Sequence, residues 1–175
     1  MKRRQDAPDS PFKVHLREIT RRTLRLLGGR SNRDVEYDFA YRNVVGSCLK
    51  ILDIGGCDSL LPIVLAKAGH QVTVYDFRPY PESHPNLTVL QGDFLNNSLP
   101  SGSFDIVIMI STIEHIGLGA YGAPEYPDAD FTVIKEVHRI LADEGKAIVT
   151  FPFNERESYT PIRAMVHARA GSASF

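Results

Sequence analysis

The sequence predicts an α/β protein with a doubly wound, mainly parallel sheet of about five strands and helices on both faces. Short apolar runs alternate with segments of helical periodicity along the 175 residues. Several of these runs end in an aspartate, and the first one meets two glycines and then residues that favour a helix start. Strands that alternate with helices favour a parallel sheet, because each crossover returns the chain to the same end of the sheet.

Residues 49–59 are expected to form the centre of the sheet and the turn that follows it. Their first half is mostly apolar, which is typical of a strand buried on both faces. Asp53 lies within this run, and Gly55 and Gly56 come directly after it. Glycine permits a tight turn and lets a ligand approach the backbone closely, so we expect a binding crevice here.

Four helices are predicted from the recurrence of apolar side chains at helical spacing and from start and stop signals. Pro11 begins the first helix, and the second precedes the central strand. Asp58 or Ser59 is expected to cap the third helix, and Asp128 or Asp130 the fourth. The expected helices cover residues 11–27, 34–45, 60–68 and 131–141.

Four further strands are predicted by short apolar and β-branched runs between turn signals. The most apolar of these runs is expected to be central and parallel. A loop rich in Gly, Pro and Tyr at 117–127 follows it, and a turn at 143–145 leads into the last strand. The expected strands cover residues 71–76, 87–90, 104–110 and 146–151.

Composition indicates a single domain, since 43% of the residues are hydrophobic and 23% are charged. We expect N-terminal helices over 1–46, a ligand-binding core over 47–151 and an irregular tail over 152–175. No apolar run reaches the roughly 20 residues that span a bilayer or forms the core of a signal peptide, so a cytoplasmic location is expected. Cys48 and Cys57 belong to no Cys/His cluster, which predicts neither a disulfide framework nor a metal site.

The N-terminal segment is basic and the rest of the chain is acidic. Nine of the 20 Lys and Arg residues lie in residues 1–30, together with three of the 21 Asp and Glu residues. A basic amphipathic helix can attract nucleic acid, anionic lipid or phosphorylated substrates. The simpler interpretation is the solvated face of a packing helix, so a nucleic-acid partner is not expected.

Candidate site residues occur at the carboxyl ends of successive strands, which lie along one rim of a parallel sheet. A carboxylate at such an end, Asp76 for example, can accept hydrogen bonds from both hydroxyls of a ribose. An aromatic ring can pack on a purine, and a further acid can accept from its exocyclic amine. These features predict a nucleoside ligand, either a dinucleotide or an adenosyl cofactor. The rim segments are 53–56, 76–77, 93–94 and 111–115.

Residues 49–151 resemble the class I S-adenosylmethionine-dependent methyltransferases, in particular the type 11-like group. The first motif of that family, Asp-x-Gly-x-Gly-x-Gly, stands here as Asp53 to Ser59, with Cys57 and Ser59 in place of the later glycines. The segments Gln-Gly-Asp-Phe, Phe-Asp-Ile-Val and Ile-Glu-His-Ile carry the resemblance further along the chain. The resemblance implies a Rossmann-like sheet with strand order 3-2-1-4-5 and S-adenosylmethionine as cofactor.

The resemblance also implies an activity and roles for individual residues. The methyl group would pass to an oxygen or nitrogen of a small molecule, and a sugar or glycan precursor is one candidate. His115 would remove the proton of the acceptor, Glu114 would orient His115 or contact the substrate, and Tyr121 and Tyr126 would close over the acceptor. The residues implied in cofactor binding are Asp53, Gly55, Gly56, Cys57, Asp76, Phe77, Asp93, Phe94 and Ser111.

Two other functions stay open on the sequence alone. A nicotinamide-dependent oxidoreductase also uses a strand, a glycine turn and an acid about 20 residues later. Its Gly-x-Gly-x-x-Gly motif fails here at Cys57 and Leu60. The other possibility is a non-catalytic protein that keeps the fold and uses its basic head to hold a partner or nucleic acid.

The end of the sequence predicts an incomplete sheet. The family's sheet normally continues into an antiparallel strand pair, which residues 152–175 do not supply. We therefore expect either a truncated chain or another segment that covers the sheet where Ile148 and Phe151 would otherwise border an open apolar edge. Such an edge predicts either self-association, for example as a homodimer, or marginal stability.

Overall fold

The computed structural model describes residues 32–119 and 124–151. Within them, five parallel strands form one sheet in the order β3-β2-β1-β4-β5. This confirms the predicted sheet and its strand order. The strands are β1 Lys50–Ile54, β2 Gln71–Asp76, β3 Leu87–Gln91, β4 Phe104–Ile110 and β5 Leu141–Thr150.

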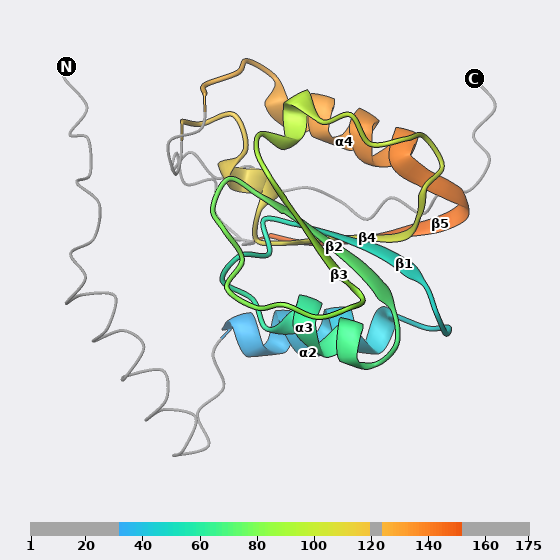
Figure 1. The fold of residues 1–175 in the computed structure, drawn as a ribbon. Coiled ribbons are helices and arrows are strands. Elements are labelled where there is room, and N and C mark those ends of the chain that lie inside the picture. The colour runs from blue at the N-terminus through green and yellow to red at the C-terminus, as the bar shows by residue number, and fades with distance from the viewer. Residues whose placement is uncertain (1–31, 120–123, 152–175) are drawn as a thin grey trace, which may run out of the picture. The chain divides into compact units, whose positions relative to one another are not determined.

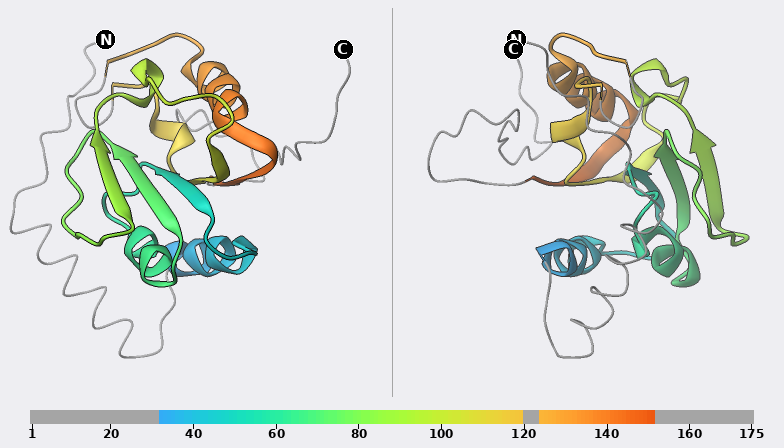
Figure 2. Two further views of the ribbon diagram at one scale, coloured as in Figure 1. Left: turned by 45° about the vertical axis from the view of Figure 1, so that its right-hand side comes forward. Right: turned by 90° about the vertical axis from the view of Figure 1, so that its left-hand side faces the viewer.

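Helices cover both faces of the sheet. Figures 1 and 2 show α2 and α3 on one face and α4 on the other. Two short 3₁₀ helices follow β3 and β4, at the end of the sheet where the site segments were expected. The helices are α2 Asn32–Asn43, α3 Leu61–Lys67, η1 Phe94–Asn96, η2 Ile113–His115 and α4 Ala129–Ile140.

The chain divides into two compact units, Met1–Val35 and Glu36–Phe175. The described residues of the first unit form only the beginning of α2. All contacts below belong to the second unit. The first predicted helix and the tail from residue 152 lie outside the described residues.

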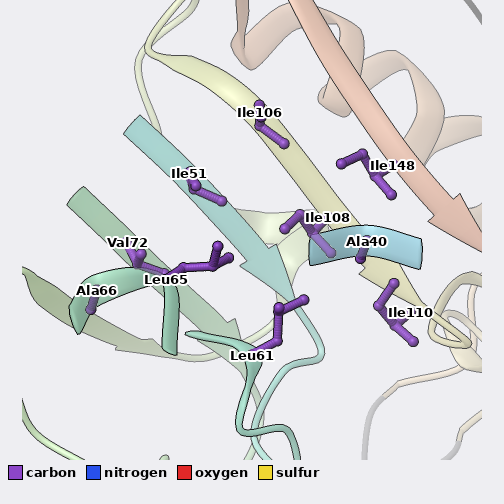
Figure 3. Packing of buried hydrophobic residues seen from close by; sticks show 10 residues of the cluster. All are labelled: Ala40, Ile51, Leu61, Leu65, Ala66, Val72, Ile106, Ile108, Ile110 and Ile148. Carbon is purple, nitrogen blue, oxygen red and sulfur yellow. The ribbon is translucent and has the colours of Figure 1, made fainter. Parts of the chain in front are cut away.

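One layer of the core packs between the sheet and helices α2 and α3. Ile51 of β1 and Ile108 of β4 are fully buried in it, as strands with covered faces require. Ala40 of α2 is also fully buried and lies beside Ile108 and Ile110 (Figure 3). Because its side chain is a single methyl group, α2 can approach β4 closely.

The second core layer packs between the sheet and α4. Val107 and Met109 of β4 point to this face, since neighbouring residues of a strand alternate between faces. Val133, Val137 and Ile140 meet them from α4 and are at most 3% exposed. Their spacing of four and three residues places them on one side of the helix.

Side-chain caps were predicted with mixed success. The N-cap of α3 is Leu60, which makes no side-chain capping bond. Ser59, one residue earlier, nevertheless accepts a hydrogen bond from the backbone N–H of Leu61 (3.0 Å), whereas Asp58 pairs with an arginine. Asp128 precedes α4 but makes no capping bond, because its backbone is left-handed (φ 53°) rather than extended. Asp130 lies inside the helix, so that prediction was wrong as well.

The last strand is longer than predicted and contains an irregularity. Phe104 pairs with Leu141 while Ile106 pairs with Lys146, so the expected turn at 143–145 is a bulge within β5. Its residue Glu144 has a left-handed backbone (φ 63°). In the part of the chain that the structure describes, β5 is the last strand of the sheet. The side chain of Ile148 is nevertheless 3% exposed and part of the core, so it does not form an apolar edge.

The core assignment predicts a large difference between two truncations to alanine. Ile108→Ala should lower the free energy of unfolding by about 2–5 kcal/mol, because it leaves a cavity between the sheet and α2. Val45→Ala should change it by less than about 0.5 kcal/mol, since Val45 is 76% exposed. Urea unfolding of the full chain measures both values. Equal losses for the two variants would contradict this packing.

Candidate functional site

The turn after β1 is built around a buried carboxyl group. Asp53 is 2% exposed, and its Oδ2 atom has no hydrogen-bond partner among the described residues. Burial, and secondarily the nearby charge of Asp76, raises the pKa of Asp53 to about 8. A buried carboxyl with an unpartnered oxygen is unfavourable, so this group is available to a hydrogen-bond donor or a cation.

The two glycines are required by side-chain packing as well as by the tight turn that the sequence predicted. A Cβ atom on Gly56 would come within 2.7 Å of the carboxyl carbon of Asp53. A Cβ atom on Gly55 would overlap the side chain of Thr112, and Gly55 has a left-handed backbone (φ 77°). Asp53 and Thr112 therefore occupy the positions that a side chain at these two glycines would need, and the predicted contact of the glycines with a ligand stays a prediction. The glycines let the turn after β1 pack against these two side chains.

Asp76 joins the ends of β1 and β2. Its Oδ2 atom accepts a hydrogen bond from the backbone N–H of Cys57 (3.1 Å), and its Oδ1 atom accepts one from that of Arg78 (2.9 Å). The side chain of Arg78 also bridges Asp58 (2.8 Å) and Asp76 (3.5 Å). Each carboxylate oxygen can accept a further bond, so these contacts orient Asp76 without saturating it.

Two neighbours of this carboxylate were also predicted to meet the cofactor. Cys57 is buried, and burial together with its hydrogen bond to Asp76 raises the pKa of the Cys57 thiol, which keeps it protonated. Phe77 is partly exposed, and its carbonyl accepts a bond from Nε2 of Gln91 (2.9 Å). Phe77 therefore lies on the rim, where a ring can pack on a ligand.

Asp93 organises the loops next to β3. Its Oδ1 atom accepts from the N–H of Leu95 (3.0 Å), so Asp93 caps η1. Its Oδ2 atom accepts from Nδ2 of Asn96 (2.9 Å) and from the hydroxyl of Tyr126 (3.1 Å). The loop before α4 is thus attached to the acid that was predicted to contact adenine. Tyr121, the other tyrosine expected here, lies outside the described residues.

The ring of Phe94 packs in the core. Phe94 is 5% exposed, and its ring meets Tyr75 edge to face with the ring centres 5.6 Å apart. An aromatic residue after an acid at a strand end suggests a surface on which adenine can pack. The 3₁₀ turn that Asp93 caps directs the ring of Phe94 inward instead. The predicted contact of Phe94 with the cofactor stays a prediction.

A residue of α2 that the sequence did not predict, Glu36, reaches the ends of β4 and β5. Ser111 was predicted to bind the cofactor, but its hydroxyl donates to Oε1 of Glu36 (2.8 Å). The hydroxyl of Thr150, at the end of β5, donates to the same oxygen (3.1 Å). Glu36 lies on α2 between Val35 and Tyr37, with an aspartate two residues away on either side, so its sequence context gives no sign that it reaches the rim.

The two residues implied in catalysis lie in η2, directly after β4. Glu114 is 6% exposed, whereas His115 is partly exposed. The backbone N–H of His115 donates to the carbonyl of Thr112 (2.9 Å), which fixes the turn. His115 is therefore the more accessible of the two side chains to a small molecule at this rim.

Backbone hydrogen bonds join the rim segments from β3 to β5. The N–H of Gly92 donates to the carbonyl of Asp76 (3.0 Å), and that of Gly55 to the carbonyl of Tyr75 (2.9 Å). The N–H of Ser111 donates to the carbonyl of Thr150 (2.9 Å).

Residues 32–119 and 124–151 contain no group of His, Cys, Asp or Glu side chains that could hold a metal ion. No helix in these ranges is both long and apolar enough to cross a membrane.

The parallel sheet, its strand order and the acids along its carboxyl rim define a Rossmann-like domain. Residues 52–149, more than half of the chain, match the methyltransferase domain family. The chain therefore belongs to this family. The class I S-adenosylmethionine-dependent methyltransferase family predicted from the sequence is confirmed. No protein with a curated description matches the chain.

Several solved structures share the fold at low sequence identity. The TehB-like SAM-dependent methyltransferase from Corynebacterium glutamicum is 19% identical, with a TM-score of 0.55 over 79% of this chain and 72% of that one. The 1,6-didemethyltoxoflavin-N1-methyltransferase of Burkholderia thailandensis, solved with S-adenosylhomocysteine, is 17% identical, with a TM-score of 0.55 over 81% and 64%. The [4+2]-cyclase SpnF is 16% identical, with a TM-score of 0.52 over 65% and 42%. The chain spans about half the length of several other matching structures.

The raised pKa of Asp53 predicts how stability depends on pH. The folded chain holds a proton on Asp53 up to about pH 8, whereas the unfolded chain releases it near 3.8. This group therefore lowers the stability of the ligand-free protein progressively as the pH rises through that interval. The thermal unfolding midpoint should fall from pH 5 to pH 8 less steeply in Asp53→Asn than in the wild type. Asp143→Asn, which changes an exposed acid, is the matched control and should follow the wild type. Parallel pH profiles for the wild type and Asp53→Asn would show that Asp53 is ionised in the folded protein.

Proposed function

We propose that this chain binds S-adenosylmethionine along the rim from β1 to β3 and transfers its methyl group to an oxygen or nitrogen of a small molecule. The observation that carries the proposal is the buried Asp53 with its unpartnered Oδ2 atom, next to the oriented carboxylate of Asp76. Two acids at adjacent strand ends suit a ligand that combines a positive charge with a ribose. Membership of the methyltransferase domain family supports the same ligand.

The residues divide the binding task between three strand ends. Asp76 is proposed to accept hydrogen bonds from the ribose hydroxyls, because its backbone contacts hold both oxygens in place. Phe77 would pack on the adenine, and Asp93 would accept from the adenine amine through a remaining lone pair. A bound cation favours the ionised form of a neighbouring carboxyl, so Asp53 would lose its proton on binding and stabilise the positively charged part of the cofactor. The turn at Gly55 and Gly56 would hold that part next to β4.

The protein needs to supply little further chemistry once the cofactor and the methyl acceptor are aligned. When bound, the cofactor supplies a methyl group already activated by its sulfonium. Holding the acceptor in line with that methyl can contribute on the order of 7–11 kcal/mol to catalysis. His115 is proposed to take the proton of the acceptor, since an imidazole can accept one near neutral pH. Glu114, buried beside it in η2, would orient His115 or contact the acceptor.

Two structures with the same fold and one sequence segment bear on the class of the acceptor. One structure with the same fold is named for methylation of a nitrogen, which makes a nitrogen acceptor worth testing first. Another is named a cyclase, so this fold by itself does not fix the reaction. A sugar or glycan precursor stays a candidate because of the Glu-His-Ile-Gly-Leu-Gly segment.

Isothermal titration of the full chain with S-adenosylhomocysteine and, separately, with NAD tests the cofactor assignment. Saturable binding of S-adenosylhomocysteine is expected. Asp76→Asn should weaken it by about 10- to 150-fold, since a hydrogen bond to a charged group contributes roughly 1.5–3 kcal/mol. Asp143→Asn should bind as the wild type does. The proposal is wrong if NAD binds and S-adenosylhomocysteine does not, and the role of Asp76 is wrong if a folded Asp76→Asn keeps full affinity.

The proposed base predicts that binding and turnover can be separated. His115→Gln should reduce methyl transfer by about 10²- to 10⁴-fold, because a general base contributes that much, while affinity for S-adenosylhomocysteine changes less than about twofold. Formation of S-adenosylhomocysteine from pools of small alcohols and amines measures the rate. His138→Gln, in α4, is the control and should retain the wild-type rate. An unchanged rate in His115→Gln would exclude His115 as the base.

A further inference from the structure

Three polar side chains meet at the carboxyl ends of β4 and β5. We call Glu36, Ser111 and Thr150 the β4–β5 cluster. The hydroxyls of Ser111 and Thr150 donate to the same oxygen of Glu36, at 2.8 and 3.1 Å. All three residues are partly exposed, so a small molecule can reach them. The proposed cofactor contacts of Asp53, the glycine turn, Asp76 and Asp93 leave this cluster unexplained.

Counting donors and acceptors shows what the cluster can bind. Each hydroxyl carries one proton, and both protons point to Glu36, which has none when ionised. The N–H of Ser111 is engaged by the carbonyl and hydroxyl oxygens of Thr150, at 2.9 and 3.2 Å. The side chains therefore have no donor left and present oxygen lone pairs beside a negative charge. A ligand must supply the donors, and a cationic donor binds such a carboxylate more strongly than a neutral one.

The place of the cluster in the sheet assigns it to the acceptor rather than to the nucleoside. Strand β1 separates β4 and β5 from β2 and β3. Asp76 is the last residue of β2, and Asp93 lies just after the end of β3. Thr112 follows Ser111 and packs against Gly55 in the turn proposed to hold the charged part of the cofactor. His115, the proposed base, comes three residues later. The cluster thus begins where the reacting end of the cofactor is expected.

The backbone at Ser111 supports a functional role. Its φ angle of 45° is left-handed, which is unusual for a residue other than glycine. Such a conformation is unfavourable and persists where surrounding contacts determine it. Here the hydrogen bonds to Thr150 and Glu36 provide those contacts. These contacts keep Ser111 in an unfavourable conformation, in a cluster whose side chains can only accept hydrogen bonds.

We propose that the β4–β5 cluster binds a protonated amine of the methyl acceptor and so determines which small molecules are methylated. The inference rests on the proposed methyl transfer. The ammonium group donates to Glu36 and to the hydroxyl oxygens of Ser111 and Thr150. It is a recognition group and not the methylated atom, because a protonated amine has no lone pair with which to accept a methyl group.

Binding of matched fragments to the full chain saturated with S-adenosylhomocysteine tests this role. Cyclohexylamine with cyclohexanol, and benzylamine with benzyl alcohol, differ in carrying an ammonium or a hydroxyl group. Ligand-detected NMR titration at pH 7 should show at least tenfold tighter binding of each amine by the wild type. Glu36→Gln should abolish that preference, and Thr150→Val, which tests the cluster without changing its charge, should reduce it.

The control is Asp38→Asn, which removes the same charge from the same helix at an exposed residue paired with Arg42. It should retain the amine preference and the affinity for S-adenosylhomocysteine. An equal affinity for amine and alcohol in the wild type, or a preference that persists in Glu36→Gln, overturns the proposal.

A second readout separates the acceptor from the cofactor. Affinity for S-adenosylhomocysteine should change less than about twofold in Glu36→Gln. A tenfold loss would assign Glu36 to the α-ammonium of the cofactor and overturn its assignment to the acceptor. A chain that binds no S-adenosylhomocysteine refutes the proposed function instead, and the amine preference of the cofactor-free chain then decides the role of the cluster by itself.

Discussion

The hydrogen bonds from the backbone of Cys57 and Arg78 to Asp76 are the contacts on which the rim depends. They hold the turn after β1 against the end of β2, and this position leaves Asp53 enclosed below the turn. This burial, together with the nearby charge of Asp76, raises the energy of the ionised form of Asp53 and so its pKa. A stable turn is therefore obtained together with an unsatisfied carboxyl group. Such a pairing of order and local instability is typical of a binding site.

The strands could be predicted because burial on two faces leaves a plain signature in the sequence. Ile106 to Ile110 form a continuous apolar run, and the structure shows all five residues buried between two helical layers. The acids at the strand ends were equally visible, since an Asp next to such a run is conspicuous. The strand order, in contrast, came from the family resemblance. Apolar runs show which segments are strands but not which strands pair.

The features that could not be predicted depend on contacts between distant residues. Glu36 reaches Ser111 and Thr150 only because α2 packs on the sheet, and nothing in its neighbourhood announces this. Phe94 was assigned to a ligand because it follows an acid, yet its ring is directed to Tyr75 by the local turn. The glycines were located correctly, but the atoms that exclude a side chain at Gly55 belong to Thr112. In each case the sequence showed the type of the residue but not the residue that it contacts.

The small side chain at Ala40 has an effect beyond packing. Residues four apart on a helix lie on the same side, so Ala40 and Glu36 both face the sheet. The methyl group of Ala40 sets how near α2 lies to β4, and the helix transmits that spacing to the carboxylate one turn away. Hydrogen bonds lengthen past usefulness within less than an ångström of displacement. A core residue without polar atoms thus sets the distance across which Glu36 meets Ser111 and Thr150. Variation at position 40 would alter these hydrogen bonds, and with them the proposed ligand preference, without changing any of the three side chains.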